Sequence, residues 1–281
     1  MIRIGTSGNP PNFFSSKFIN NRLNCPEWLN SIGLNALEIM FTYGARTSEQ
    51  NALQMGINAK KFDVQLSVHS PYYVVLTSNK KKVIKNSFNE MLKTLKLSDL
   101  MHSKTAVLHP GFMNVNDPIG RVIKNLNKIN EKAKQLGYKT KIALETMGKT
   151  SQLGSFDHII QICKETKCIP CIDFAHVHAR TFGSLKTKKD FRIILEKIEK
   201  ELGKKFLRNL HCHFYPVYYG DKGEKSHAPF KDKKALPHFE PFAELIKEFK
   251  MHPTLISEFK DSQDLGANFM KKQLKKIGYL K

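Results

Sequence analysis

The sequence predicts a closed (β/α)8 barrel, and three observations lead to this fold class. Eight short runs rich in apolar and β-branched residues alternate with longer segments of helical periodicity. The length of 281 residues is close to the roughly 250 residues typical of such barrels. No low-complexity linker or internal repeat interrupts the chain. We therefore expect one barrel domain over residues 1–281.

The strands are expected where the apolar runs fall, namely at Ile2–Ser7, Ala36–Phe41, Val64–Ser70, Thr105–Pro110, Lys141–Thr146, Cys171–His176, Leu210–Phe214 and Thr254–Phe259. A doubly wound open sheet is the alternative. It usually has fewer strands and a glycine-rich first turn that binds phosphate. Here Gly8 is followed by Asn9, Pro10 and Pro11, and proline is unsuited to such a turn because it lacks an N–H. The barrel is therefore favoured.

Helices are expected between these strands, where apolar residues recur at a spacing of three or four. The clearest are Lys82–Met101, Ile119–Leu136, Phe191–Leu202 and Phe239–Phe249. Asp261 or Ser262 is expected to cap the last helix. The single tryptophan, Trp28, lies on a short amphipathic segment and is expected to pack against the barrel.

The net charge points to a polyanionic partner. The chain has 46 Lys and Arg against 25 Asp and Glu, a formal charge of +21. Any single lysine cluster also fits a solvated helix face. The sum, however, creates a positive field that binds nucleic acid at least non-specifically.

Other classes are disfavoured by composition. An apolar fraction of 41% with 10% aromatic residues does not suit general disorder. No window approaches 18 uninterrupted apolar residues, so no membrane span is expected. The segment Met1–Gly8 lacks the apolar core of a secretory signal, and five cysteines, an odd number, suggest a reducing compartment. We expect a cytoplasmic, DNA-associated monomer.

Histidines and carboxylates gather at the expected carboxyl ends of the strands, where barrel enzymes carry their chemistry. From the third strand to the eighth these residues are His69, His109, Glu145, Asp173 with His176 and His178, His211 with His213, and Glu258. One such histidine is more often structural. Three or more imidazoles beside three carboxylates would remain unpaired or repel unless cations held them.

This donor chemistry suits Zn²⁺, with Mn²⁺ or Fe²⁺ as alternatives. The donors exceed the three or four protein ligands of one site, so a cluster of two or three ions is expected. Clustered divalent ions polarise a phosphoryl oxygen and activate water near neutral pH. Together with the positive charge, this predicts hydrolysis of a nucleic-acid phosphodiester.

In their order along the chain, these motifs resemble the endonuclease IV family of DNA-repair enzymes. The matching segments run from HSPYY at His69 to ISEF at Glu258 and include HPG, LET, IDFAH and LHCHF. The resemblance implies a xylose isomerase-like TIM barrel with two or three zinc ions. It also implies cleavage on the 5′ side of an abasic site in double-stranded DNA, leaving a 3′-hydroxyl.

The resemblance also implies a ligand set. His69, His109 and Glu145 would hold the first ion. Glu145 would bridge to a second ion, held also by Asp173, His211 and Glu258. Glu145 or Glu258 would orient the attacking water and serve as the catalytic carboxylate.

The third site departs from the family pattern. His176 would belong to it, but the family completes this site with Asp-x-His after the seventh strand, and His227 here has Lys225 two positions before it. Glu224 or Asp221 is the candidate substitute. The form GxKGExxH resembles a divergent, archaeal-type branch of the family.

Three residues are candidates for DNA contact. Tyr72 matches the position of a family tyrosine near the abasic nucleotide, although a packing role fits equally well. Arg46 would enter a DNA groove or bind a phosphate, or else be an ordinary exposed loop residue. Arg180 would hold a phosphate with two hydrogen bonds.

His178 and His213 are expected to orient ligands rather than bind metal. Cys168 and Cys171 are expected to be buried thiols, because the Cys-x-x-Cys motif has no second pair.

Two rival functions remain open. A metal-dependent sugar isomerase or epimerase of the xylose isomerase-like barrels would carry similar strand-end ligands, but it needs neither the +21 charge nor a His176/His227 pair. A non-enzymatic basic DNA-binding protein would leave the strand-end donors without a role.

Overall fold

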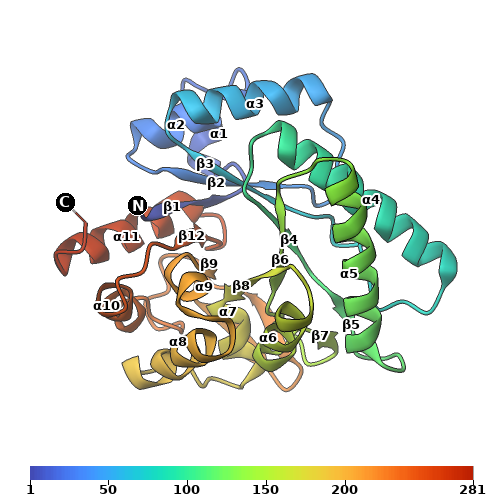
Figure 1. Cartoon of the computed structure of the whole chain (residues 1–281). Coiled ribbons are helices and arrows are strands. Elements are labelled where there is room, and N and C mark those ends of the chain that lie inside the picture. The colour runs from blue at the N-terminus through green and yellow to red at the C-terminus, as the bar shows by residue number, and fades with distance from the viewer. Residues whose placement is uncertain (281) are drawn as a thin grey trace.

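The computed structural model describes residues 1–280. Eight parallel strands close into a barrel in the order β1-β12-β9-β8-β6-β4-β3-β2, which confirms the expected fold class. They are β1 Arg3–Ser7, β2 Ala36–Met40, β3 Gln65–His69, β4 Thr105–Leu108, β6 Lys141–Glu145, β8 Ile169–Asp173, β9 His211–Phe214 and β12 Thr254–Ser257. Helices surround them (Figure 1).

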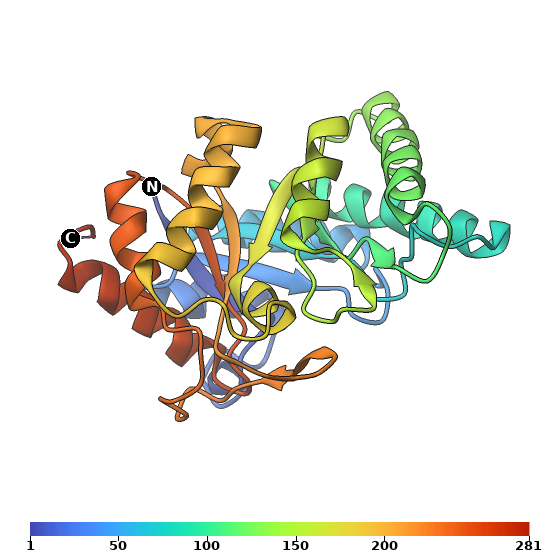
Figure 2. The same ribbon diagram turned by 90° about the horizontal axis from the view of Figure 1, so that it is seen from below.

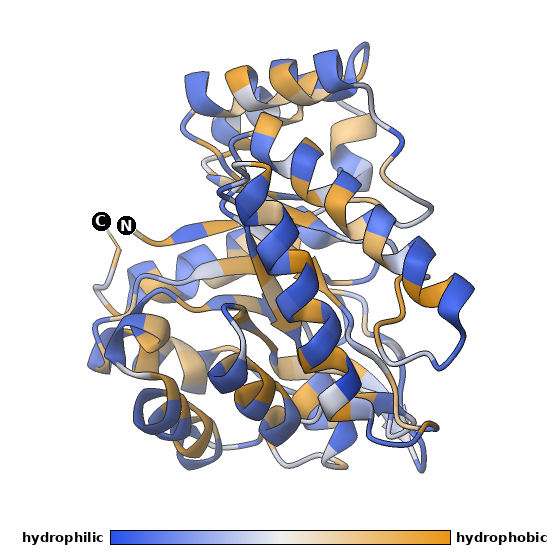
Figure 3. Cartoon of the chain, turned by 45° about the vertical axis from the view of Figure 1, so that its right-hand side comes forward, coloured by the Kyte–Doolittle hydropathy of each residue, from blue (hydrophilic) through white to orange (hydrophobic). Residues whose placement is uncertain are grey.

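The expected amphipathic helices appear as α4 Lys81–Leu100, α5 Pro118–Gln135, α8 Lys188–Leu202 and α10 Glu240–Glu248. The remaining helices are α1 Pro11–Phe14, η1 Arg22–Asn24, α2 Cys25–Ser31, α3 Glu49–Lys61, α6 Phe156–Glu165, α7 Phe174–Arg180, α9 Lys204–Arg208 and α11 Gln263–Lys276. In Figure 3 hydrophilic and apolar residues alternate along the long helices, and buried residues of these helices belong to the hydrophobic core clusters. Trp28 belongs to this buried core, as expected. Ser262 is the N-cap residue of α11 but makes no side-chain capping bond.

Two short sheets lie outside the barrel. β5 Gly111–Phe112 pairs with β7 Gln152–Leu153, and β10 Val217–Gly220 pairs with β11 Gly223–His227. Figure 2 shows the second hairpin projecting from the barrel beyond the strand ends. This hairpin was not expected from the sequence.

One expected strand is wrong at its carboxyl end. β8 stops at Asp173, and His176 and His178 lie on α7. The Asp173 carboxylate accepts the backbone N–H of His176 at 2.7 Å and so caps the helix. His176 is therefore presented by the first turn of a helix rather than by a strand.

Strand alternation sets which side chains enter the barrel. In β9, Cys212 and Phe214 belong to the outer core around the barrel, so His211 and His213 point inward. The register pairs Cys171 of β8 with His211 and Asp173 with His213. His213 is thus in the same layer as Asp173 at the carboxyl mouth, and His211 is one layer deeper.

Candidate metal centre

The first group of donors consists of His69, His109 and Glu145, the set that the resemblance implies for the first ion. Glu145 Oε2 is 3.1 Å from His69 Nε2 and 2.9 Å from His109 Nε2, and the two imidazole nitrogens are 3.2 Å apart. His69 Nδ1 faces the Ser70 carbonyl at 2.8 Å, so this nitrogen carries the proton and Nε2 presents its lone pair.

These separations fit a bound divalent ion. Ligand atoms about 2.0 Å from a tetrahedral ion are about 3.3 Å from one another. The structure holds no ion, and the fit therefore rests on the converging donors. Asp173 Oδ2 adds to it, because this atom is buried within the cluster without a hydrogen-bond partner.

The second group surrounds His213. Its Nδ1 is 3.2 Å from Glu145 Oε1, 3.5 Å from Glu258 Oε1 and 3.8 Å from Asp173 Oδ2. Glu145 therefore offers one oxygen to the first group and the other to the second, as a bridging ligand would. The structure brings His213, and not His211, to these three carboxylates.

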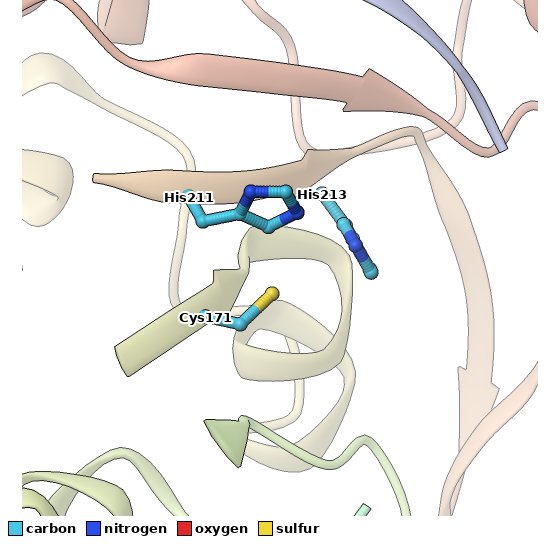
Figure 4. A group of neighbouring side chains, drawn as sticks. All are labelled: Cys171, His211 and His213. Carbon is cyan, nitrogen blue, oxygen red and sulfur yellow. The ribbon is translucent and has the colours of Figure 1, made fainter. Parts of the chain in front are cut away.

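His211 lies elsewhere in the barrel. It lines the cavity at the opposite, amino-terminal mouth together with Thr105 and Thr254, and its Nε2 pairs with Glu38 at 2.9 Å. Figure 4 shows His211 and His213 on one strand and the Cys171 thiol of β8 pointing toward that strand. These three residues form a further group of donors, but burial raises the pKa of the Cys171 thiol and keeps it protonated.

The third group is built around Glu224. Its Oε2 is 3.1 Å from His176 Nε2, and its Oε1 is 3.4 Å from His227 Nε2. The other ring nitrogen of each histidine is held by a carbonyl, at Thr146 for His176 and at Glu258 for His227, both at 2.7 Å. Each Nε2 is thereby directed at Glu224. Asp221 makes no ion pair within residues 1–280.

Burial and neighbouring charged groups shift the pKa values of the carboxylates in this site. Burial alone would raise the pKa of Glu145, but the adjacent His213 and His109 hold it well below its usual range. Burial, reinforced by Glu145 and Glu258, raises the pKa of Asp173 to about 7. A divalent cation at this position would favour the ionised Asp173 and relieve the repulsion among the carboxylates.

Tyr72 covers the first group. Its ring stacks on His109, with centroids 5.2 Å apart and planes at 25°. It meets the His69 ring in a T-shaped arrangement, with centroids 5.2 Å apart. The side chain remains 49% exposed. It therefore forms both a wall of the metal centre and part of the outer surface.

The two arginine candidates differ. Arg46 is exposed on the loop after β2. Arg180 donates from its guanidinium to four backbone carbonyls, those of Met147, Lys149 and Thr150 in the β6–β7 connection and that of Gln152 at the start of β7. In the structure Arg180 therefore stabilises the backbone of this loop.

His178 is turned away from the donors. Its Nδ1 accepts the backbone N–H of Leu185 at 3.1 Å, and its ring meets the edge of Tyr219. Burial lowers its pKa to about 4, so this side chain is neutral.

Sequence reasoning missed Glu38. This residue is fully buried in the middle of β2 and pairs with His211 and His213. An isolated acid in an apolar run was the available signal, but the partners are 173 or more residues away.

The fold and this donor-lined mouth define a (β/α)8 barrel with a candidate metal centre at the carboxyl ends of its strands. Residues 26–277 match the family described as xylose isomerase-like TIM barrel, and the chain belongs to this family. The expected kinship with endonuclease IV proteins is confirmed at the level of the family.

Two curated relatives are similar to this chain in sequence. An uncharacterised protein of Methanocaldococcus jannaschii is 30% identical over 261 residues, 92% of each chain. A probable endonuclease 4 of Mycoplasmoides gallisepticum is 29% identical over 153 residues, 52% of this chain and 49% of the relative.

Solved structures show the same fold. Endonuclease IV from Thermus thermophilus superposes with a TM-score of 0.71 at 15% identity, over 98% of this chain and 99% of that one. A D-tagatose 3-epimerase-like protein gives a TM-score of 0.70 at 18% identity, over 98% of each. None of the helices described in residues 1–280 has the length and apolar character needed to cross a membrane.

Proposed function

We propose that this protein is a metal-dependent endodeoxyribonuclease that hydrolyses the phosphodiester 5′ to an abasic site and leaves a 3′-hydroxyl. The observation that carries the proposal is the bridging position of Glu145 between two donor groups, with a third group beside it. Such a row of sites suits phosphodiester hydrolysis, because neighbouring divalent ions would stabilise both the attacking and the leaving oxygen.

The geometry supports an assignment of ligands to three ions. His69, His109 and Glu145 would hold the first ion; Glu145, Asp173, His213 and Glu258 the second; and His176, Glu224 and His227 the third. When bound, zinc or manganese would polarise the phosphate and lower the pKa of the attacking water, so that it loses its proton near neutral pH. Glu145 and Glu258 flank the space between the sites, and their oxygens would accept a hydrogen bond from the attacking water and so orient it.

The surface around the mouth supports a nucleic-acid substrate. In residues 1–280, every exposed aromatic side chain lies in a segment that follows the carboxyl end of a barrel strand; these are Phe14, Tyr43, Tyr72, Tyr73, Phe112, Phe182, Tyr218 and Tyr219. Exposed aromatic rings can stack on nucleic-acid bases, and this stacking depends little on the base sequence.

Positive charge accompanies these rings. Lys222 and Lys225 on the β10–β11 hairpin have no ion-pair partner within the described chain. Such lysines would contact phosphates on either side of a lesion.

The test is incision of an abasic duplex by the protein supplied with Zn²⁺ or Mn²⁺. His109→Ala and Glu145→Ala are expected to lower the rate by at least about 100-fold, because each removes a ligand. The matched undamaged duplex is the control. A wild-type rate of incision in either variant would contradict the proposed role of that residue as a metal ligand.

The alternative is a metal-dependent sugar isomerase or epimerase, and the likeness of the fold to the epimerase-like protein is what favours it. Metal analysis and a sugar assay separate the two functions. Conversion of a free ketose without cleavage of DNA would favour the epimerase, whereas three ions and binding to duplex DNA at moderate salt would favour the nuclease.

A further inference from the structure

Glu38 is a buried carboxylate whose only polar partners within residues 1–280 lie inside the barrel. Its Oε2 accepts the Ser67 hydroxyl at 2.7 Å and pairs with His211 Nε2 at 2.9 Å, while its Oε1 is 2.9 Å from His213 Nε2. No lysine or arginine of the described chain reaches it. Removing a carboxylate from water is costly, so this position calls for an explanation.

The explanation lies in the two sides of the His213 ring. Nδ1 faces the carboxylates of the second donor group, whereas Nε2 faces Glu38. A neutral imidazole has a single N–H, and a hydrogen bond at one nitrogen determines that the other carries the lone pair. Metal-binding histidines are commonly oriented in this way by a carboxylate.

We propose that Glu38 is a positioning residue that holds the proton of His213 on Nε2 and thereby presents Nδ1 to the second metal ion. The inference rests on the proposed metal-dependent function. Nδ1 is in hydrogen-bond geometry with Glu145 Oε1 at 3.2 Å, whereas Nε2 and Glu38 Oε1 are at contact distance but outside hydrogen-bond alignment. An ion held by Nδ1 would take the lone pair of that nitrogen and leave the single ring proton at Nε2, where Glu38 is the acceptor within reach.

The other contacts of Glu38 fix its carboxylate. Ser67 is its register partner on the neighbouring strand β3, and His211 is two residues before His213 on β9. Both occupy Oε2 and leave Oε1 for His213. Glu38, His213 and Glu258 also form a group of donors close enough to hold an ion, but the contacts of Oε2 with Ser67 and His211 and of Oε1 with His213 Nε2 favour the positioning role.

The variants Glu38→Met and Glu38→Gln test the proposal in the full chain. Met removes the acceptor at similar size, and Gln keeps an acceptor oxygen without charge. We expect E38M to weaken one ion by about 10- to 100-fold, to lower kcat with little change in KM, and to shift the ¹⁵N resonances of His213 away from the Nε2–H tautomer. E38Q should restore part of each effect.

Ser103→Ala is the matched control, because Ser103 is a buried polar residue at the amino end of the barrel that contacts only backbone. It should lower stability without changing metal affinity. Unchanged zinc affinity and His213 resonances in folded E38M, or in E38Q if E38M does not fold, would overturn the proposal.

The zinc titration and the ¹⁵N spectrum need no DNA. If the wild type binds zinc but does not cut abasic DNA, the proposed function fails while Glu38 is still judged on metal binding.

Discussion

Glu224 lies between two imidazoles that come from different parts of the chain, with His176 Nε2 at 3.1 Å and His227 Nε2 at 3.4 Å. His176 is on α7 and His227 ends β11, so the hairpin brings the carboxylate over the barrel mouth. Both histidines hold the pKa of Glu224 well below its usual range, although burial opposes them.

This pairing predicts that Glu224 completes the third site. Glu224→Ala should lose one bound ion by elemental analysis and cleave abasic DNA at least about tenfold more slowly, because a ligand is removed. Asp221→Ala is the matched control on the same hairpin and should keep the full metal content. Equal metal content in the two variants would assign the third site to other residues.

The position of His213 predicts a second outcome. His213→Ala should lose the second ion, since Nδ1 is the nitrogen that faces Glu145, Asp173 and Glu258. His211→Asn should retain it, because His211 faces the amino-terminal cavity. Metal titration of the folded variants compares them. Loss of the ion in the His211 variant, with retention in the His213 variant, would assign the ligand role to His211.

The arginines predict separate effects on stability and DNA binding. Arg180→Ala should lower the free energy of unfolding by about 1–3 kcal/mol, because four carbonyls lose a charged donor. Arg46→Ala should leave stability unchanged. It should also reduce the slope of log DNA affinity against log salt concentration by about 1, the value for one lost phosphate contact. Denaturant titration and binding at several salt concentrations measure the two effects. A lower salt slope in the Arg180 variant would give that residue a phosphate contact.

His178 predicts a pH-dependent loss of stability. Its side chain is buried, and its pKa is about 4 in the folded chain and about 6.5 when unfolded. The unfolded state therefore binds the proton more readily, and stability is lost as the pH falls through 6.5 toward 4. The loss between pH 7 and pH 5 should be about 1–2 kcal/mol.

The matched variant is His178→Asn, whose side-chain oxygen can still accept the N–H of Leu185. It should unfold with a shallower pH dependence than the wild type in urea titrations at each pH. An equal slope would show that His178 titrates normally in the folded protein.

The barrel and most of its donors are evident in the sequence for a physical reason. Parallel strands place their carboxyl ends at one mouth, so His69, His109, Glu145 and Glu258 could be assigned to that mouth from strand limits alone. The apolar periodicity of the helices is equally local, and the observed helices begin and end close to the expected residues.

The depth of a side chain in the barrel was decided only by the tertiary structure. His211 and His213 both point inward because alternate residues of a strand share a face, yet they are about 6.6 Å apart along it. The register that pairs Asp173 with His213 selects which of them meets the carboxylates. The same closure brings Glu38 across the barrel to His213 and the hairpin to His176, and contacts between such distant segments leave no periodic signal in the sequence.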